Sequence, residues 1–183
     1  MLPYIFIVLA LGLRFASKPI AFTSVSAALL FFGARASRRN AWIAWVLCAA
    51  TDVILTTVVY SYPLTWDQFV TWAWYAAALG LGMLLRNTNS PLRIGATSLL
   101  SSMIFFAVSN FAVWASYRTL YAATLQGLIN CYLAAVPFFR HTLAADMVFT
   151  AIFFGLPLLL AGTAGDVLAP AAPEGARKRS TAR

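Results

Sequence analysis

The sequence predicts an all-α integral membrane protein: a bundle of six transmembrane helices with a short helical cap between helices 5 and 6. Of its 183 residues, 62% are hydrophobic and only 10% are charged. The apolar residues fall into six segments separated by short polar breaks, and a spanning helix needs roughly 20 such residues, or fewer inside a bundle. We therefore expect a transmembrane domain over residues 1–163 and a disordered, basic cytoplasmic tail over residues 164–183, which is rich in Ala, Pro and Arg.

The polar breaks give the expected helices their boundaries. ASRRN and YPLTWDQ enclose the third segment, and RNTNSP, with its Asn, Ser and Pro, ends the fourth in a turn. The first two segments are short. In chain order the six helices are expected at residues 2–16, 20–34, 41–62, 69–85, 92–115 and 142–162.

The segment between the fifth and sixth expected helices is too polar to span and too apolar for a plain loop. It contains LQGLINCYLAAVPFF, in which Gln126 and Asn130 cannot face lipid with unsatisfied groups and Pro137 interrupts a helix. We therefore expect a short helix here that lies over the bundle or dips into it as a cap.

Basic residues indicate the orientation. Nine Lys and Arg side chains fall at helix ends on the N-terminal side or in the tail, against four on the opposite side. This bias predicts that both termini are cytoplasmic. The net charge of +8 comes from these basic residues. They lie at the ends of apolar segments, where basic residues set topology and contact anionic lipid. We therefore expect the lipid bilayer, and no nucleic acid, as a partner.

Two acids, Asp52 and Asp146, stand inside apolar segments, where a carboxylate is costly unless it meets a partner, a cavity or a ligand. Helical spacing of three or four residues aligns each acid with other polar groups. The three resulting stripes are Cys48, Asp52 and Thr56; Ser98, Ser102 and Ser109 with Asn110 beside them; and Thr142, Asp146 and Thr150. Such stripes line either a binding cavity or a hydrogen-bonded packing seam. For the two acids we favour the cavity.

The predicted substrate site lies towards the outer half of the membrane. We expect Asp146 and Asn110 to face one another, with Asp52 deeper. Around them we place Thr23, Trp114, Asn130 and Arg140. Amide, carboxylate and aromatic groups together suit a heterocycle with polar edges.

Several of these residues also have a structural interpretation. Arg140 either caps the membrane interface or pairs with Asp146 or an anionic ligand group. Arg14 either extends outward to the interface or pairs with Asp52. Asp146 itself could bond Arg140 or the cap backbone and so act as a clasp. Trp114 belongs to an aromatic belt or stacks on a ligand.

Several catalytic motifs are missing from the sequence. There is no G-x-x-x-x-G-K-[ST] phosphate loop and no H-E-x-x-H, and the single histidine argues against a zinc enzyme. The spacing of Cys48 and Cys131 matches neither a metal site nor a disulfide framework. We therefore expect no enzymatic activity, no metal and no cofactor.

Three stretches carry a family resemblance: FTSVSAALLFFGA, SLLSSMIFFAVSNFAVW and TLQGLINCYLAAVPFFRHTLAADMVFTAIFFG. Over residues 13–155 they resemble an uncharacterised family of six-helix bacterial membrane proteins with SNF-x-VW, GL-x-x-CY-x-A-x-PFF-x-x-T and a following Asp. That family in turn is similar to the substrate-binding S components of energy-coupling factor (ECF) transporters.

The resemblance implies a function. It points to a multi-pass protein of the bacterial inner membrane that binds a small polar or vitamin-like molecule from outside for uptake. A separate scaffold subunit and two ATPases would drive transport. The alternative is a structural or accessory membrane protein without a transported substrate.

Overall fold

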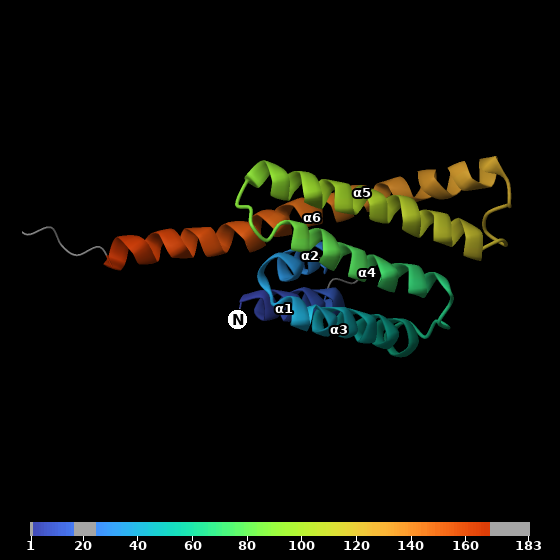
Figure 1. The fold of residues 1–183 in the computed structure, drawn as a ribbon. Helices are drawn as coiled ribbons and strands as arrows, with labels where there is room; N and C mark the ends of the chain where they lie inside the picture. Colours follow the sequence, from blue (N-terminus) through green and yellow to red (C-terminus); the bar gives the residue numbers. More distant parts are fainter. Residues whose placement is uncertain (1, 17–24, 169–183) are drawn as a thin grey trace, which may run out of the picture.

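The computed structural model describes residues 2–16 and 25–168, with side chains as far as residue 160. Thr23 and the tail from residue 169 lie outside these ranges. All regular elements of the described chain are helices, and the long ones run side by side (Figure 1). The elements are α1 (Leu2–Ala16), α2 (Val25–Arg35), a 3₁₀ turn η1 (Arg38–Asn40), α3 (Ala41–Val53), a π-helical continuation η2 (Ile54–Val59), α4 (Asp67–Leu84), α5 (Pro91–Ser116) and α6 (Leu125–Leu168).

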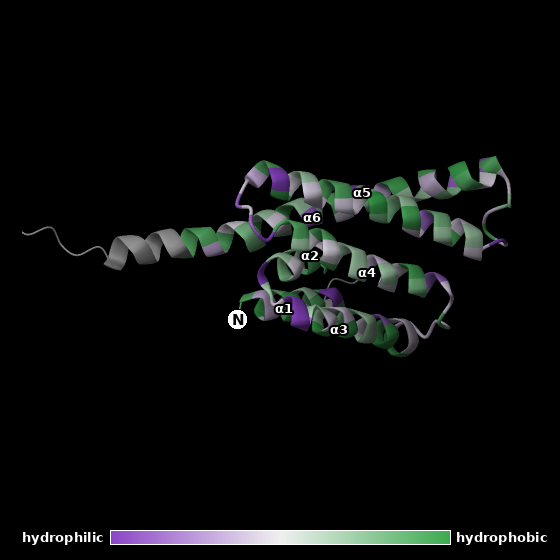
Figure 2. Ribbon diagram, viewed as in Figure 1, coloured by the Kyte–Doolittle hydropathy of each residue, from purple (hydrophilic) through white to green (hydrophobic). Residues whose placement is uncertain are grey.

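The helix positions follow from local sequence signals. Helix α5 begins where Ser90 caps the backbone N–H of Arg93 and Pro91 occupies the first turn, a position at which proline loses no helical hydrogen bond. Figure 2 shows that apolar residues make up most of the helices, whereas the most hydrophilic residues gather mainly at the helix ends and loops. This distribution fits a helical membrane protein.

Helix α2 lies at the centre of the bundle and contacts α4 most closely. The two glycines that face each other here, Gly33 and Gly82, leave no room for a Cβ, which would meet the backbone of Leu79 and Leu30 respectively. Small residues at such a crossing let two helix backbones approach each other, as is common in membrane proteins. The aromatic rings of Phe6, Phe31 and Phe153 fill the neighbouring space, with the Phe6 and Phe153 centroids 4.5 Å apart.

The prediction of a separate cap between helices 5 and 6 is wrong. One continuous helix, α6, extends over 44 residues from Leu125 and includes both the predicted cap and the predicted sixth helix. Gln126 donates to Asn130 at 2.9 Å along the same helix, so these polar groups are satisfied without a separate element. Pro137 lies inside α6 and does not end it, because neighbouring groups in a bundle can compensate for the lost hydrogen bond.

The number of long apolar spans also differs from the six that we predicted. Three helical stretches of the described chain are long and apolar enough to cross a bilayer: Arg38–Val59, Pro91–Ser116 and Leu125–Leu160. Helices α1 and α2 are apolar but short, with 15 and 11 residues. Helix α4 has 18 residues but is not among these stretches, chiefly because the polar Asp67 and Gln68 at its start lower its mean hydropathy.

Candidate functional site

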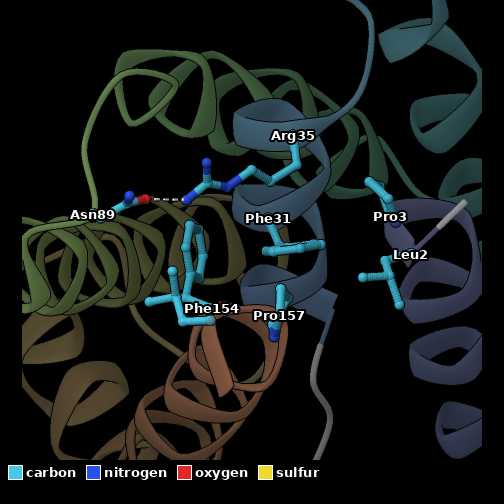
Figure 3. A pocket seen from close by; sticks show the side chains of 8 residues that line it. Leu2, Pro3, Phe31, Arg35, Asn89, Phe154 and Pro157 are labelled. Carbon is cyan, nitrogen blue, oxygen red and sulfur yellow. Dashed lines mark hydrogen bonds between the residues drawn. The ribbon is translucent and has the colours of Figure 1, made fainter. Parts of the chain in front are cut away.

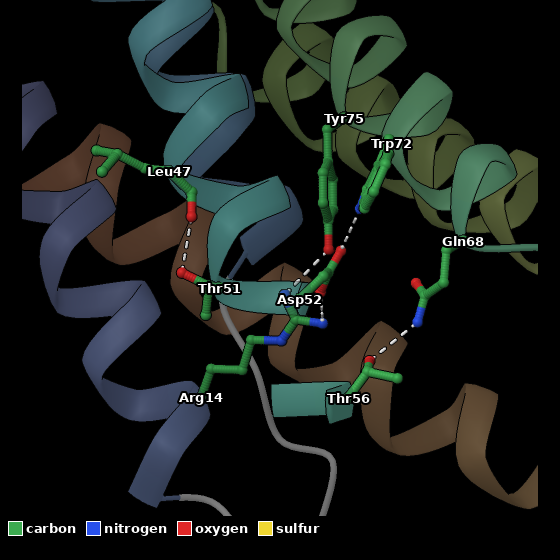
Figure 4. Close-up of polar contacts among 8 residues, drawn as sticks. All are labelled: Arg14, Leu47, Thr51, Asp52, Thr56, Gln68, Trp72 and Tyr75. Atoms are coloured by element: carbon green, nitrogen blue, oxygen red, sulfur yellow. Dashed lines mark hydrogen bonds and ion pairs between the residues drawn. The ribbon is translucent and has the colours of Figure 1, made fainter. Parts of the chain in front are cut away.

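Asp52 lies in a charge-paired network that joins three helices (Figure 4). Its side chain is 2% exposed and forms an ion pair with Arg14 of α1. The indole N–H of Trp72 on α4 donates to the other carboxylate oxygen at 3.2 Å. The same Arg14 guanidinium donates to the Tyr75 hydroxyl, also on α4, at 3.0 Å. The second interpretation of Arg14, as the partner of Asp52, is therefore confirmed.

This network accounts for the first polar stripe. One turn beyond Asp52 in the same stripe, the Thr56 hydroxyl accepts a hydrogen bond from the side-chain amide of Gln68 on α4 at 3.0 Å. Both acceptor oxygens of Asp52 have a donor and its charge has a counter-charge, so the group is compensated within the protein. The arrangement is suited to fastening α1, α3 and α4 together, and it leaves Asp52 apart from the other predicted site residues.

The second and third stripes face one another between α5 and α6. The hydroxyls of Ser98 and Thr150 lie 2.9 Å apart. One turn further along, the Ser102 hydroxyl donates to Oδ2 of Asp146 at 2.6 Å. Asp146 is 1% exposed, so this carboxylate is enclosed as fully as Asp52. The i, i+4 spacing of these residues was the signal that identified the seam in the sequence.

Asp146 differs from Asp52 in how its oxygens are satisfied. Ser26 of α2 also interacts with the carboxylate, but it does not have hydrogen-bond geometry to Oδ1. Oδ1 therefore has no hydrogen-bond partner among the described residues. The ion pair of Arg14 and Asp52 is the one salt bridge in the described part of the chain, so Asp146 has no basic partner there. A buried oxygen in this condition keeps full capacity to accept a hydrogen bond.

A cavity of about 230 Å³ lies along the same α5–α6 seam, towards the α5–α6 connection. Its polar wall consists of Ser102, Ser109, Asn110 and Thr142. Its apolar wall consists of Ala135 and four phenylalanines, Phe105, Phe106, Phe138 and Phe139. Asp146 lies next to this cavity through its bond to Ser102 and is not itself part of the wall.

The polar wall of this cavity is rich in acceptors. The hydroxyls of Ser109 and Thr142 and the amide N–H of Asn110 each donate to a carbonyl one turn earlier in their own helix, at 2.7, 3.2 and 2.8 Å. The two hydroxyl donors are thereby used and the Asn110 amide keeps one free N–H, while the hydroxyl and amide oxygens retain lone pairs. With the nearby carboxylate, the cavity is suited to a molecule that donates hydrogen bonds and has a flat apolar body.

The other predicted site residues lie elsewhere. The indole N–H of Trp114 donates to the Ala122 carbonyl at 2.9 Å, and the Arg118 guanidinium lies 4.6 Å from the centroid of its ring. Asn130 accepts from Gln126. Arg140 borders a separate hollow with Pro137 and His141 and does not pair with Asp146. Thr23 lies outside the described residues.

The sequence patterns did not identify some residues of the Asp52 network and of the α5–α6 cavity. Trp72 and Tyr75 lie three residues apart on one face of α4, but many aromatic residues in this chain have such spacing. Phe105, Phe106 and Phe139 stand out only once α5 and α6 are placed side by side. Ser102 belonged to a predicted stripe but was not selected as a site residue, although it is the hydrogen-bond donor to Asp146.

The comparison with known families identifies one match. A family model described as "Family of unknown function (DUF6580)" matches residues 1–167, and the chain belongs to this family. No curated protein and no solved structure matches the chain.

Proposed function

We propose that this member of the family is a membrane protein that binds a small polar or vitamin-like molecule for uptake, with its site in the cavity between α5 and α6. The observation that carries the proposal is Asp146, which is buried without a cationic partner among the described residues and is joined through Ser102 to an acceptor-rich cavity. An acid enclosed among apolar helices is costly, and a ligand that donates a hydrogen bond would compensate for it.

The wall chemistry favours a particular class of ligand. Ser102, Asn110 and Thr142 offer oxygen lone pairs, and Asp146 adds negative charge close by. The facing phenylalanines suit a flat ring. We therefore propose a small heterocycle with amine or ring N–H donors, either neutral or cationic. A cavity of about 230 Å³ limits the bound part to a single ring system with short substituents.

Uptake would require partners. A substrate-binding subunit of the ECF type works with a scaffold subunit and two ATPases, and we retain these partners as part of the proposal. Three long spans do not match the six expected of an S component. The binding proposal therefore rests on the α5–α6 cavity and not on that resemblance, and the two parts need separate tests.

Binding is tested by thermal unfolding of the purified protein in detergent against a panel of water-soluble vitamins and heterocyclic amines. A ligand present at one hundred times its Kd would stabilise the fold by about 2.7 kcal/mol. We expect at least one amine-bearing heterocycle to raise the Tm. Asp146→Asn should weaken its affinity by roughly 1 to 3 kcal/mol, because a charge-assisted hydrogen bond is lost.

The matched control is Asp67→Asn, which removes a carboxylate at the start of α4, outside the cavity. It should leave ligand affinity unchanged. If no compound raises the Tm, or if Asp146→Asn lowers stability without changing affinity, the α5–α6 seam is a structural clasp.

In that case the alternative, a structural or accessory membrane protein, is the better description. The direct bond between Ser98 and Thr150 is the observation that favours it, because hydroxyl pairs of this kind are common at helix contacts. Partner subunits are tested independently by co-purification of the tagged chain from its native membrane. Recovery of ATPases would support the uptake role, and their absence would limit the proposal to binding.

A further inference from the structure

A second pair of hollows lies at the other end of the bundle, where α1 and α5 begin and α2 and α4 end. The first hollow, of about 400 Å³, is bordered by α1, α2 and α6 (Figure 3). Arg35 and Asn89 form its polar side, and the Arg35 guanidinium donates to the Asn89 side-chain oxygen at 2.7 Å. Phe31, Phe154 and Pro157 form its apolar side.

The second hollow, of about 270 Å³, lies between α5 and α6 and continues the first. Asn89, Phe154 and Leu158 line both hollows. Away from Asn89, the second hollow is bordered mainly by apolar groups. It includes Gly95 and Gly155, and a Cβ added at either glycine would meet no atom within 4 Å. The two hollows form one groove with a polar end and an apolar body, which we call the α6 groove.

The charge at this end of the bundle is strongly positive. Arg35, Arg38, Arg39, Arg86 and Arg93 lie on the helix ends and the connections here. The Arg86 guanidinium donates a hydrogen bond to the Ala36 carbonyl, whereas Arg35 lines the α6 groove. The acids with described side chains do not neutralise this charge, because Asp67 begins α4, whose other end lies here, and Asp52 and Asp146 lie inside α3 and α6.

We propose that the α6 groove is a binding site for an anionic phospholipid. The phosphate would lie against Arg35 and Asn89, because a guanidinium has five N–H donors and only one is used by Asn89 here. One acyl chain would follow Phe154, Gly155 and Gly95 between α5 and α6. A free phosphate ion would leave the apolar body of the groove unfilled, and a zwitterionic lipid would not match the positive charge.

The test uses the full chain, delipidated in detergent, with thermal unfolding and native mass spectrometry as readouts. The probes are dioleoylphosphatidylglycerol, dioleoylphosphatidylcholine and inorganic phosphate. We expect the phosphatidylglycerol to raise the Tm and to remain bound in the mass spectrum, and the other two to do neither. Arg35→Gln should weaken phosphatidylglycerol binding by roughly tenfold, as expected for one lost charge-assisted contact.

Two further variants separate the groove from general surface charge. Arg39→Gln removes an equal charge at the same end but outside the groove, and should change binding less than about twofold because an exposed single charge contributes little. Gly155→Leu should place its side chain in the apolar body and abolish binding while the fold is kept, because the Cβ at this position has open space around it. Equal losses from Arg35→Gln and Arg39→Gln, an equal response to phosphatidylcholine, or a response to phosphate alone would overturn the proposal.

Discussion

Asp52 and Asp146 are chemically identical groups with nearly identical burial, at 2% and 1% exposure. Their surroundings are opposite. Asp52 has an arginine and an indole N–H, and both of its oxygens are bound. Asp146 has a serine hydroxyl on one oxygen, no hydrogen bond on the other among the described residues, and a cavity alongside.

The difference shows that burial of an acid does not by itself identify a functional site. A buried carboxylate with its own cation fastens helices, and its removal leaves an uncompensated charge. A buried carboxylate without a cation retains unused acceptor capacity, which is the property that ligand binding requires. The two acids should therefore respond differently to the same substitutions.

The largest expected effect follows from Asp52→Ala. Arg14 would lose its counter-charge and Trp72 its acceptor, so the free energy of unfolding should fall by about 3 kcal/mol, near the lower end for a broken buried pair. We place it there because the Arg14 side chain is 23% exposed and can regain some water. Chemical unfolding in detergent micelles measures the change.

A double variant, Arg14→Met with Asp52→Leu, sharpens this first prediction. Replacing both charges by apolar groups should recover most of the lost stability, because no unpaired charge remains. If Asp52→Ala alone unfolds with the wild-type free energy, the network does not fasten α1 to α3.

The next effect concerns the hydrogen bond that the Ser102 hydroxyl donates to Asp146. Ser102→Ala removes it and should lower the free energy of unfolding by about 2 kcal/mol, the cost of a lost hydrogen bond to a charged group. Its neighbour provides a control: the Ser101 hydroxyl is buried with no partner in the described part of the chain. Ser101→Ala should leave the free energy of unfolding unchanged or raise it, because the substitution removes a buried hydroxyl that makes no hydrogen bond among the described residues. Equal effects of the two substitutions would contradict the assigned bond.

A smaller effect is expected for Trp72→Phe, which keeps a ring but removes the N–H that bonds Asp52. We expect a loss of about 1 kcal/mol from this hydrogen bond. A double-mutant cycle with Asp52→Leu isolates it from the change in ring size. The coupling free energy should be about 1 kcal/mol, and a value near zero would show that the indole contributes by packing alone.

The smallest effect, and one of different sign, is expected for Asp146→Asn. The amide oxygen can still accept from Ser102, and the uncompensated charge is removed. The free energy of unfolding should therefore stay within about 0.5 kcal/mol of the wild type or rise above it. Asp52→Asn, measured alongside, should be destabilising. If the two Asp→Asn variants lose equal stability, the contrast between the acids is not real.

Much of the helical framework could be predicted from the sequence because its boundaries are local signals. The predicted first helix, 2–16, coincides with α1, and the starts of α3, α4 and α5 lie within two residues of the prediction. Helix α6 was divided because Pro137 and its polar neighbours resembled a break. Whether a proline ends a helix depends on the packing around it, which a local pattern does not contain.

The candidate site shows the same limit. Periodicity correctly placed Ser98 and Ser102 on one face of α5, and Asp146 and Thr150 on one face of α6. It could not say which stripes face each other, because that depends on how helices far apart in sequence pack. The Asp52 stripe was therefore grouped with the other two, although its partners are Arg14 and α4.

The unequal helix lengths have a consequence for the surrounding lipid. The apolar part of α6, Leu125–Leu160, spans 36 residues or about 54 Å, well above a hydrocarbon thickness of about 30 Å. Helix α1, with 15 residues and an outward row of Ile5, Val8 and Leu9, spans only about 22 Å. One face of the protein is thus too long for the bilayer and another too short. In a membrane it should thin the lipid beside α1 while α6 tilts or projects, so bilayers of different thickness will favour different tilts of the whole bundle.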